Sequence, residues 1–219
     1  MESPFEENKK QRAEATTYDE SEFIEEVNIK GDYEKLIESI GKENFIIGVF
    51  GDIFTGKTKY SMEFAKVLAN NLNKPVFFKG LEDDEVPEGF TRFENMDEVP
   101  DNVIIIYDEM GCSGNCRRSN SKENIKLVEE FKKLRHRGWV MIYIDQSSRG
   151  NDVGLYERIQ VFILKEPSIT QLEMERGVTK QLYERCKEYF NKEDNRPIAC
   201  LFSKRYEGVI NLQLKTENI

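Results

Sequence analysis

The sequence predicts an α/β fold of three layers, α/β/α, in which helices cover both faces of a mostly parallel sheet. Short apolar runs alternate with segments of helical periodicity along most of the 219 residues, which is the pattern of repeated β-α units. The runs at residues 44–50 and 102–107 are almost continuously apolar, as expected for strands covered on both faces. The apolar segments 198–203 and 208–214 predict a C-terminal β-hairpin.

The other elements follow from the same patterns. Residues 33–40 have helical apolar spacing and end at Gly41, a common helix C-cap. Residues 80–100 are acidic and contain prolines, so they predict an irregular connection. The remaining predicted strands are 74–79, 139–144 and 160–165, and the remaining predicted helices are 57–71, 122–135 and 179–190.

The N-terminal part differs in composition from the rest. Residues 1–26 lack a sustained apolar period, which predicts a flexible tail. Residues 1–39 hold 12 Asp and Glu against 5 Lys and Arg, a net charge of −7, which leaves −2 for the remainder. We therefore expect residues 1–41 to form an acidic, partly disordered extension with one short helix, and residues 42–219 to form the main domain. A nearly neutral domain can carry a basic face or pore, so charge does not exclude a nucleic-acid partner.

Several classes of protein are disfavoured. No apolar run approaches the roughly 20 residues that a membrane-spanning helix needs, and the acidic opening residues do not form a signal peptide. We expect a cytoplasmic protein. The single histidine, His136, argues against Ser-His or Cys-His catalysis. The four cysteines lack paired C-x2-C spacing, which favours free thiols over a zinc site; they are Cys112, Cys116, Cys186 and Cys200.

Residues 51–58 match the phosphate-binding motif G-x-x-x-x-G-K-[ST] at all four fixed positions, between a predicted strand and a predicted helix. Gly51 and Gly56 allow backbone conformations that turn successive N–H groups toward a phosphate. Lys57 is expected to reach the β- and γ-phosphates, and Thr58 to place its hydroxyl on Mg²⁺. The alternative is a glycine turn before a helix with an exposed lysine. The motif predicts a P-loop NTPase whose nucleotide site comprises Gly51, Asp52, Ile53, Phe54, Thr55, Gly56, Lys57 and Thr58.

Two acidic residues end the apolar run at 103–107. Because ligands of an open parallel sheet bind beyond the carboxyl ends of its strands, Asp108 and Glu109 are expected beside the phosphate loop. Asp108 would hold Mg²⁺, and Glu109 would orient and polarise the attacking water. The alternative is a solvated acid pair. A glutamate base favours an ATPase over a nucleotide kinase or signalling GTPase. No guanine-reading Asn-Lys-x-Asp motif is evident, so the expected activity is Mg²⁺-dependent ATP hydrolysis.

Gln146 follows the apolar run 139–144 and Asp145. A polar side chain at the end of the strand next to the acidic one can contact both the γ-phosphate and the attacking water. Gln146 is therefore a candidate sensor of the bound nucleotide. An ordinary polar loop residue is the alternative.

The order of these features resembles the FtsK/HerA class of ATPases, and within it the small packaging-type ATPases of archaeal and bacterial viruses and integrated elements. The resemblance covers roughly residues 44–166, and its discriminating part is the Arg-His-x-Gly segment before the strand that ends near Gln146. In that class an arginine before this strand acts on a neighbouring subunit's nucleotide. Arg135 is the best match and Arg137 the second, while Arg158 is a weaker match for a further arginine after the glutamine. The alternative is a solvated basic helix end.

The resemblance implies an oligomeric ring that translocates or packages double-stranded DNA, in the host cytoplasm if the chain is viral. The small, polar and basic segment 111–122 could contact DNA phosphates or be an insertion. One alternative is an ATPase that acts on protein in virion or pilus-like assembly or in secretion, with the acidic tail as a docking segment. A small-molecule kinase is disfavoured by Glu109 and by the lack of an evident Arg-rich lid.

Overall fold

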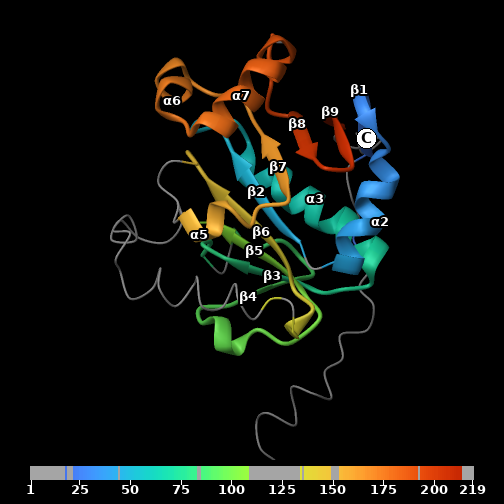
Figure 1. The fold of residues 1–219 in the computed structure, drawn as a ribbon. Helices are drawn as coiled ribbons and strands as arrows, with labels where there is room; N and C mark the ends of the chain where they lie inside the picture. Colours follow the sequence, from blue (N-terminus) through green and yellow to red (C-terminus); the bar gives the residue numbers. More distant parts are fainter. Residues whose placement is uncertain are drawn as a thin grey trace, which may run out of the picture.

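The computed structural model describes residue 18 and residues 22–43, 45–82, 85–108, 134, 136–148, 153–191 and 193–213. Within these ranges, nine strands form one sheet in the order β1-β9-β8-β7-β2-β6-β5-β3-β4 (Figure 1). The strands are β1 Glu22–Gly31, β2 Ile46–Phe50, β3 Val76–Lys79, β4 Phe90–Arg92, β5 Ile104–Asp108, β6 Val140–Asp145, β7 Val161–Leu164, β8 Ile198–Ser203 and β9 Tyr206–Gln213. The helices are α2 Tyr33–Glu43, α3 Lys57–Leu72, α5 Val153–Tyr156, α6 Ile169–Met174 and α7 Gly177–Cys186, with 3-10 turns η2 Met96–Glu98 and η3 Lys187–Tyr189.

The sheet is parallel from β7 across to β4 and antiparallel at its other end. β2 pairs in parallel with both β6 and β7, and β5 pairs in parallel with β6 and β3. β7–β8, β8–β9 and β9–β1 are antiparallel pairs. The mostly parallel sheet and the C-terminal hairpin, β8–β9, confirm the predicted fold class. The parallel pairing brings the carboxyl ends of β2, β5 and β6 to the same edge of the sheet.

Both faces of the central strands are buried. Ile104 and Ile106 of β5 belong to one apolar cluster, and Ile105 between them belongs to the other. Because successive side chains of a strand point to opposite faces, this division explains the continuous apolar run in the sequence. Full burial of each such side chain stabilises the fold by about 1.5–3 kcal/mol.

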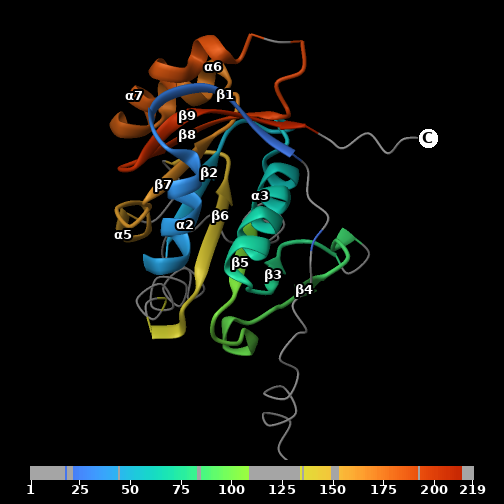
Figure 2. The same cartoon turned by 90° about the vertical axis from the view of Figure 1, so that its right-hand side faces the viewer.

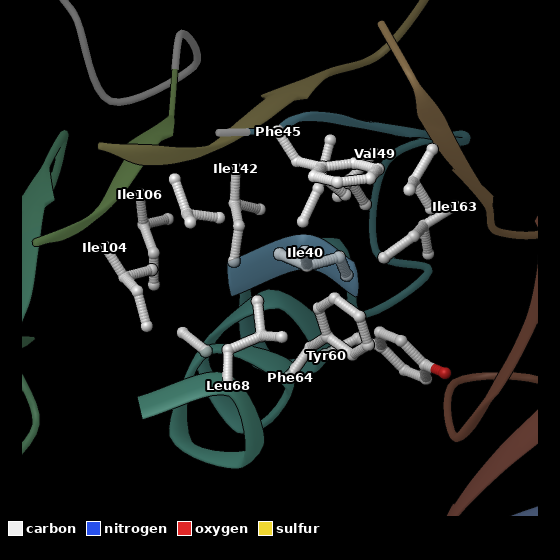
Figure 3. Close-up of a cluster of buried hydrophobic side chains, with 14 of the residues drawn as sticks. Ile40, Phe45, Val49, Tyr60, Phe64, Leu68, Ile104, Ile106, Ile142 and Ile163 are labelled. Carbon is white, nitrogen blue, oxygen red and sulfur yellow. The ribbon is translucent and has the colours of Figure 1, made fainter. Parts of the chain in front are cut away.

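Helices α2 and α3 cover one face of the sheet (Figure 2). Figure 3 shows side chains of both helices meeting those of the strands; the labelled residues are Ile40, Phe45, Val49, Tyr60, Phe64, Leu68, Ile104, Ile106, Ile142 and Ile163. The cluster on the other face includes Leu155 of α5 and two residues of α7, Tyr183 and Cys186. The three layers that the sequence predicts are therefore present.

The predicted flexible tail ends too late in the sequence. β1 begins at Glu22 and pairs along its length with β9, and Tyr18 is buried with its N–H donating to Asn70 Oδ1 at 3.0 Å, so the prediction was wrong for residue 18 and residues 22–26. β1 is an edge strand with mostly exposed side chains, which is why its apolar pattern is weak. Its Phe23 packs edge-on against Tyr60 of α3, with ring centroids 5.5 Å apart. The division of the chain at residue 42 stays a prediction.

Four short elements were not predicted. β4 and η2 lie in the stretch 80–100, which was expected to be irregular, while α5 precedes β7 and α6 follows it. Elements of three to six residues contain too little periodicity to be detected from sequence. The helix expected at 179–190 is α7, which ends at Cys186 and continues as η3. Of the helix expected at 122–135, only Leu134 lies within the described residues, and it is helical and buried. In the described part of the chain, no helix has the length and apolar character needed to cross a membrane.

Candidate active site

The phosphate loop connects β2 to α3 at the carboxyl edge of the sheet. Its start is tied to the segment that follows β7, because the Lys165 N–H donates to the Phe50 carbonyl at 2.7 Å and the Asp52 N–H donates to the Glu166 carbonyl at 3.0 Å. A Cβ added to Gly51 would lie only 2.6 Å from the Lys165 Cβ. Only glycine fits this close approach, which explains the first fixed position of the motif.

Gly56 is the N-cap of α3, with φ 78° and ψ 23°. This left-handed conformation is strained for most side chains, which explains the second fixed glycine. α3 begins at the next residue, Lys57, so the unpaired N–H groups of its first turn lie at the end of the loop. Such a helix start favours bound anions.

Lys57 is buried and folds back over its own loop. Its Nζ donates to the Gly51 carbonyl at 3.0 Å and to the Asp52 carbonyl at 2.7 Å. An ammonium group has three donors, so one remains for a phosphate oxygen. Burial lowers the pKa of Lys57, while the charges of Asp108, Asp52 and Asp145 act in the opposite direction. A buried cation, in surroundings of low dielectric constant, attracts an anion more strongly than it would in water.

Thr58 and Asp108 are brought into direct contact. The Thr58 hydroxyl donates to Asp108 Oδ2 at 2.7 Å, and Asp108 is 5% exposed at the end of β5. Gly80, which follows β3, allows this packing, because a Cβ there would lie 2.5 Å from the Asp108 carbonyl oxygen. A hydroxyl and a carboxylate are hard oxygen ligands, the kind that Mg²⁺ prefers. The pair predicted to hold Mg²⁺ thus has suitable chemistry and proximity.

Gln146 lies just beyond β6, the strand between β2 and β5. Its N–H donates to Asp145 Oδ1 at 2.6 Å, and its carbonyl accepts from Gln171 Nε2 of α6 at 2.5 Å. The next turn is fixed similarly, since the Ser148 N–H donates to Glu175 Oε2 at 3.0 Å. Gln171 and Glu175 therefore hold the backbone of the candidate sensor. The sequence offered no sign of this role, because α6 is short and distant in sequence.

Some expected site residues fall outside the described residues. These are Glu109, Arg135 and the basic segment 111–122 with Cys112 and Cys116. Their assigned roles stay predictions. Cys186 and Cys200 are described, and both are buried free thiols, as expected. Across the described ranges, His, Cys, Asp and Glu side chains nowhere gather in threes as a metal cluster.

Arg137 is engaged in structural contacts. Its guanidinium lies 4.0 Å from the centroid of the Trp139 ring. It donates to Asp101 Oδ1 at 2.7 Å and to the Val99 carbonyl at 2.5 Å. These groups lie near the amino end of β6, at the opposite edge of the sheet from the phosphate loop. The contacts favour a structural role over the trans-acting role that its sequence position suggested.

Replacing Arg137 with alanine is expected to lower the free energy of unfolding by about 2–3 kcal/mol, since a stacked cation and charge-assisted hydrogen bonds are lost. Urea denaturation would measure the change. Arg158→Ala is a suitable control because Arg158 is exposed, and it should shift stability by less than about 0.5 kcal/mol. Equal stability of the two variants would contradict the structural role of Arg137.

Arg158 precedes β7, so it too lies at the amino edge of the parallel strands. The phosphate loop follows the carboxyl end of β2, which pairs in parallel with β7. Arg158 is therefore badly placed to act on a nucleotide bound by its own chain. Any action on a neighbouring subunit stays a prediction.

A cavity of about 360 Å³ opens beside the phosphate loop. It is lined by residues 52–55 of the loop and by the segments 166–168 and 193–196. Asn195 Nδ2 donates to Glu166 Oε2 at 3.1 Å, which links the two segments. Phe54 is 91% exposed at the tip of the loop, with an uncommon positive φ of 61°. Sequence reasoning identified the loop but not the opposite wall of this cavity.

No protein-family model and no curated protein matches the chain. Solved structures of similar fold do exist. One is the genome packaging NTPase B204 from Sulfolobus turreted icosahedral virus 2 in complex with ATP-gammaS, with a TM-score of 0.56, 11% identity, and coverage of 78% of this chain and 98% of that one. Another is B204, the DNA-packaging ATPase from Sulfolobus turreted icosahedral virus, with a TM-score of 0.53, 10% identity, and coverage of 78% and 98%.

A third similar structure is EssC (ATPases 2 and 3) from Geobacillus thermodenitrificans, with a TM-score of 0.52 and 10% identity. It covers 93% of this chain, which spans 47% of the EssC chain. At identities of 10–11%, these structures show only that the chain shares their fold. The P-loop NTPase fold and the resemblance to packaging-type ATPases are confirmed at that level.

Proposed function

We propose that this chain binds and hydrolyses ATP as an oligomeric motor that moves double-stranded DNA. The observation that carries the proposal is the contact of Thr58 with Asp108 next to the buried Lys57. A cation for phosphate and two oxygen ligands for Mg²⁺ thus meet at the start of a helix, the arrangement that phosphoryl transfer from a nucleotide requires.

ATP would lie along the carboxyl edge of the sheet. The loop N–H groups, the start of α3 and Lys57 would bind the phosphates. The nucleoside would extend into the cavity beside the loop, between residues 52–55 and residues 193–196. The cavity volume falls within the range of known small-molecule sites.

Hydrolysis needs a metal ion and an activated water. Thr58 and Asp108 would hold Mg²⁺, which supplies positive charge to the transferring phosphoryl group. Glu109 follows Asp108 directly in sequence and is the proposed base for the attacking water. Gln146, at the end of the neighbouring strand β6, is the proposed sensor of the γ-phosphate.

Assembly would complete the site. Arg135 is the proposed trans-acting arginine, and the engagement of Arg137 with Trp139 and Asp101 supports the choice between these two neighbours. A guanidinium from the next subunit would stabilise the transition state by a factor of about 10³–10⁵ in rate. Hydrolysis would then depend on the formation of a homo-oligomeric ring. The ring would work in the cytoplasm, which is the host's cytoplasm if the chain is viral.

The proposal that the motor moves DNA rests on the similarity of its fold to that of two viral proteins. The two viral proteins of similar fold are described as genome-packaging or DNA-packaging enzymes, and each is covered over 98% of its length. The net charge of only −2 outside residues 1–39 is compatible with a basic surface. An ATPase acting on protein in virion or pilus-like assembly or secretion is the competing function.

The decisive measurement is the ATPase rate of the assembled protein with and without duplex DNA. We expect duplex DNA to raise turnover several-fold, and the effect to weaken as salt increases because phosphate contacts release counterions. Lys57→Met protein, in which turnover should be strongly reduced, serves as the control for contaminating activity. Basal turnover that duplex DNA leaves unchanged would contradict translocation and favour a protein substrate.

A further inference from the structure

Lys165 is the residue after β7, and its side chain is fully buried. Its Nζ donates to the Arg196 carbonyl at 2.6 Å and also to the Ile198 carbonyl. The same Nζ lies 4.6 Å from the centroid of the Tyr60 ring on α3. Lysines are rarely buried to this degree, so the position requires an explanation that the proposed chemistry does not supply.

Lys165 joins the phosphate loop to the opposite wall of the cavity. Its backbone pairs with Phe50 at the start of the loop, and its Cβ lies against Gly51. Its ammonium group holds the chain at Arg196 and Ile198, where β8 begins. Residues 193–196, which precede β8, form the cavity wall that faces residues 52–55.

The wall also touches the far end of the loop. A Cβ at Gly56 would lie 3.3 Å from the Arg196 carbonyl oxygen, the same oxygen that accepts from Lys165 Nζ. One main-chain carbonyl thus contacts both the glycine before α3 and the buried lysine. A shift of Arg196 would alter the cavity and the loop together.

The buried cation carries a penalty for the folded state. Burial lowers the pKa of Lys165 to about 7, far below the ordinary value of a lysine. The charged groups that act on it are Asp194 and Glu166, which favour the ammonium form, and Lys57, which opposes it. Taking a charge out of water carries a large free-energy cost, and two neutral carbonyl acceptors offset that cost only in part. A lysine here is therefore better explained by function than by stability.

We propose that Lys165 is a positioning residue of the nucleotide site, which holds Arg196 and Ile198 in place so that the cavity is shaped to receive the nucleoside of ATP. This inference rests on the proposed function of the loop. Phosphate contacts come from Lys57 and the loop itself, so Lys165 should affect the nucleoside part of the ligand more than its phosphates.

The test replaces Lys165 with methionine, which keeps an unbranched side chain and removes the donor. We expect the dissociation constant for ATP to rise about tenfold, while that for inorganic triphosphate changes less than twofold. The melting temperature without ligand should change little, because the two carbonyls lose a donor while the cost of the buried charge is removed. Lys180→Met, at an exposed position of α7, is the matched control and should bind both ligands as the unaltered protein does. Lys165→Gln, which restores a donor in the form of an amide, should have an ATP dissociation constant between those of the Lys165→Met variant and the unaltered protein.

The pH dependence gives a second readout. As pH rises through about 7, Lys165 loses its charge and its bonds to the two carbonyls weaken, so the preference for ATP over triphosphate should decline. The methionine variant should lack this decline. Unchanged ATP affinity in the methionine and glutamine variants would overturn the proposal. So would a lower melting temperature with equal loss of ATP and triphosphate binding. If the unaltered protein binds neither ligand, the proposed function itself fails.

Discussion

Replacing Lys57 with methionine should reduce ATP turnover about 10²- to 10³-fold, the loss typical when one preorganised donor to a developing charge is removed. Lys57 is the buried cation of the phosphate loop, and its Nζ lies within hydrogen-bond distance of the carbonyls of Gly51 and Asp52. Methionine fills a similar space without a charge or a donor. Steady-state phosphate release and binding of a fluorescent ATP analogue would measure the effect.

The matched control for this variant is Lys66→Met on the same helix. Lys66 pairs with Glu63 at 3.0 Å, away from the loop residues, so its loss should leave turnover unchanged. Circular dichroism should show that both variants are folded. If Lys57→Met protein keeps more than half of the normal rate, Lys57 does not bind the transferred phosphate.

The second large effect is expected for Asp108→Asn, which should lower turnover about 10²-fold and raise the Mg²⁺ concentration needed for half-maximal rate. The amide oxygen of asparagine can still accept from the Thr58 hydroxyl, so the contact between loop and strand survives. What is lost is the negative charge that a hard divalent cation requires. A magnesium titration of ATPase activity would separate weaker metal binding from a defect that excess metal does not rescue.

Asp32→Asn is the control for Asp108→Asn. Asp32 lies before α2, with its side chain 44% exposed, and pairs with Lys35. Its change should leave the magnesium titration unaltered. An identical titration curve for Asp108→Asn and the unaltered protein would exclude Asp108 as a metal ligand.

The central strands and the phosphate loop could be predicted because their causes are local. A continuous apolar run followed by Gly51, Gly56 and Lys57 allows few alternatives. The position of Asp108 beside the phosphate loop followed from a rule of parallel sheets, since the loop and Asp108 both lie at carboxyl ends of strands. These predictions depended on the backbone and on hydrophobic periodicity, which the sequence displays directly.

The parts that could not be predicted depend on contacts between distant segments. Lys165 donates hydrogen bonds to the main-chain carbonyls of residues 196 and 198. Because every residue has a main-chain carbonyl, these partners leave no mark in the sequence. The basic residue Arg137 had the sequence position of a trans-acting arginine, whereas its packing on Trp139 and its bond to Asp101 favour another role. Strand β1 has mostly exposed side chains, so its hydrogen bonds to β9 leave little trace in its composition.

The pairing of β1 with β9 also bears on how the chain folds. The sheet order places β1 at one end, beside β9, although β1 ends at Gly31 and β9 begins at Tyr206. The pairing of β1 with β9 therefore closes a long loop of chain, which is an entropic barrier to folding. The helices and parallel strands that lie between β1 and β9 in the sequence can pack first. Attachment of β1 is then expected to be a late step of folding, and until it occurs the unpaired edge of β9 is a site for mispairing between chains.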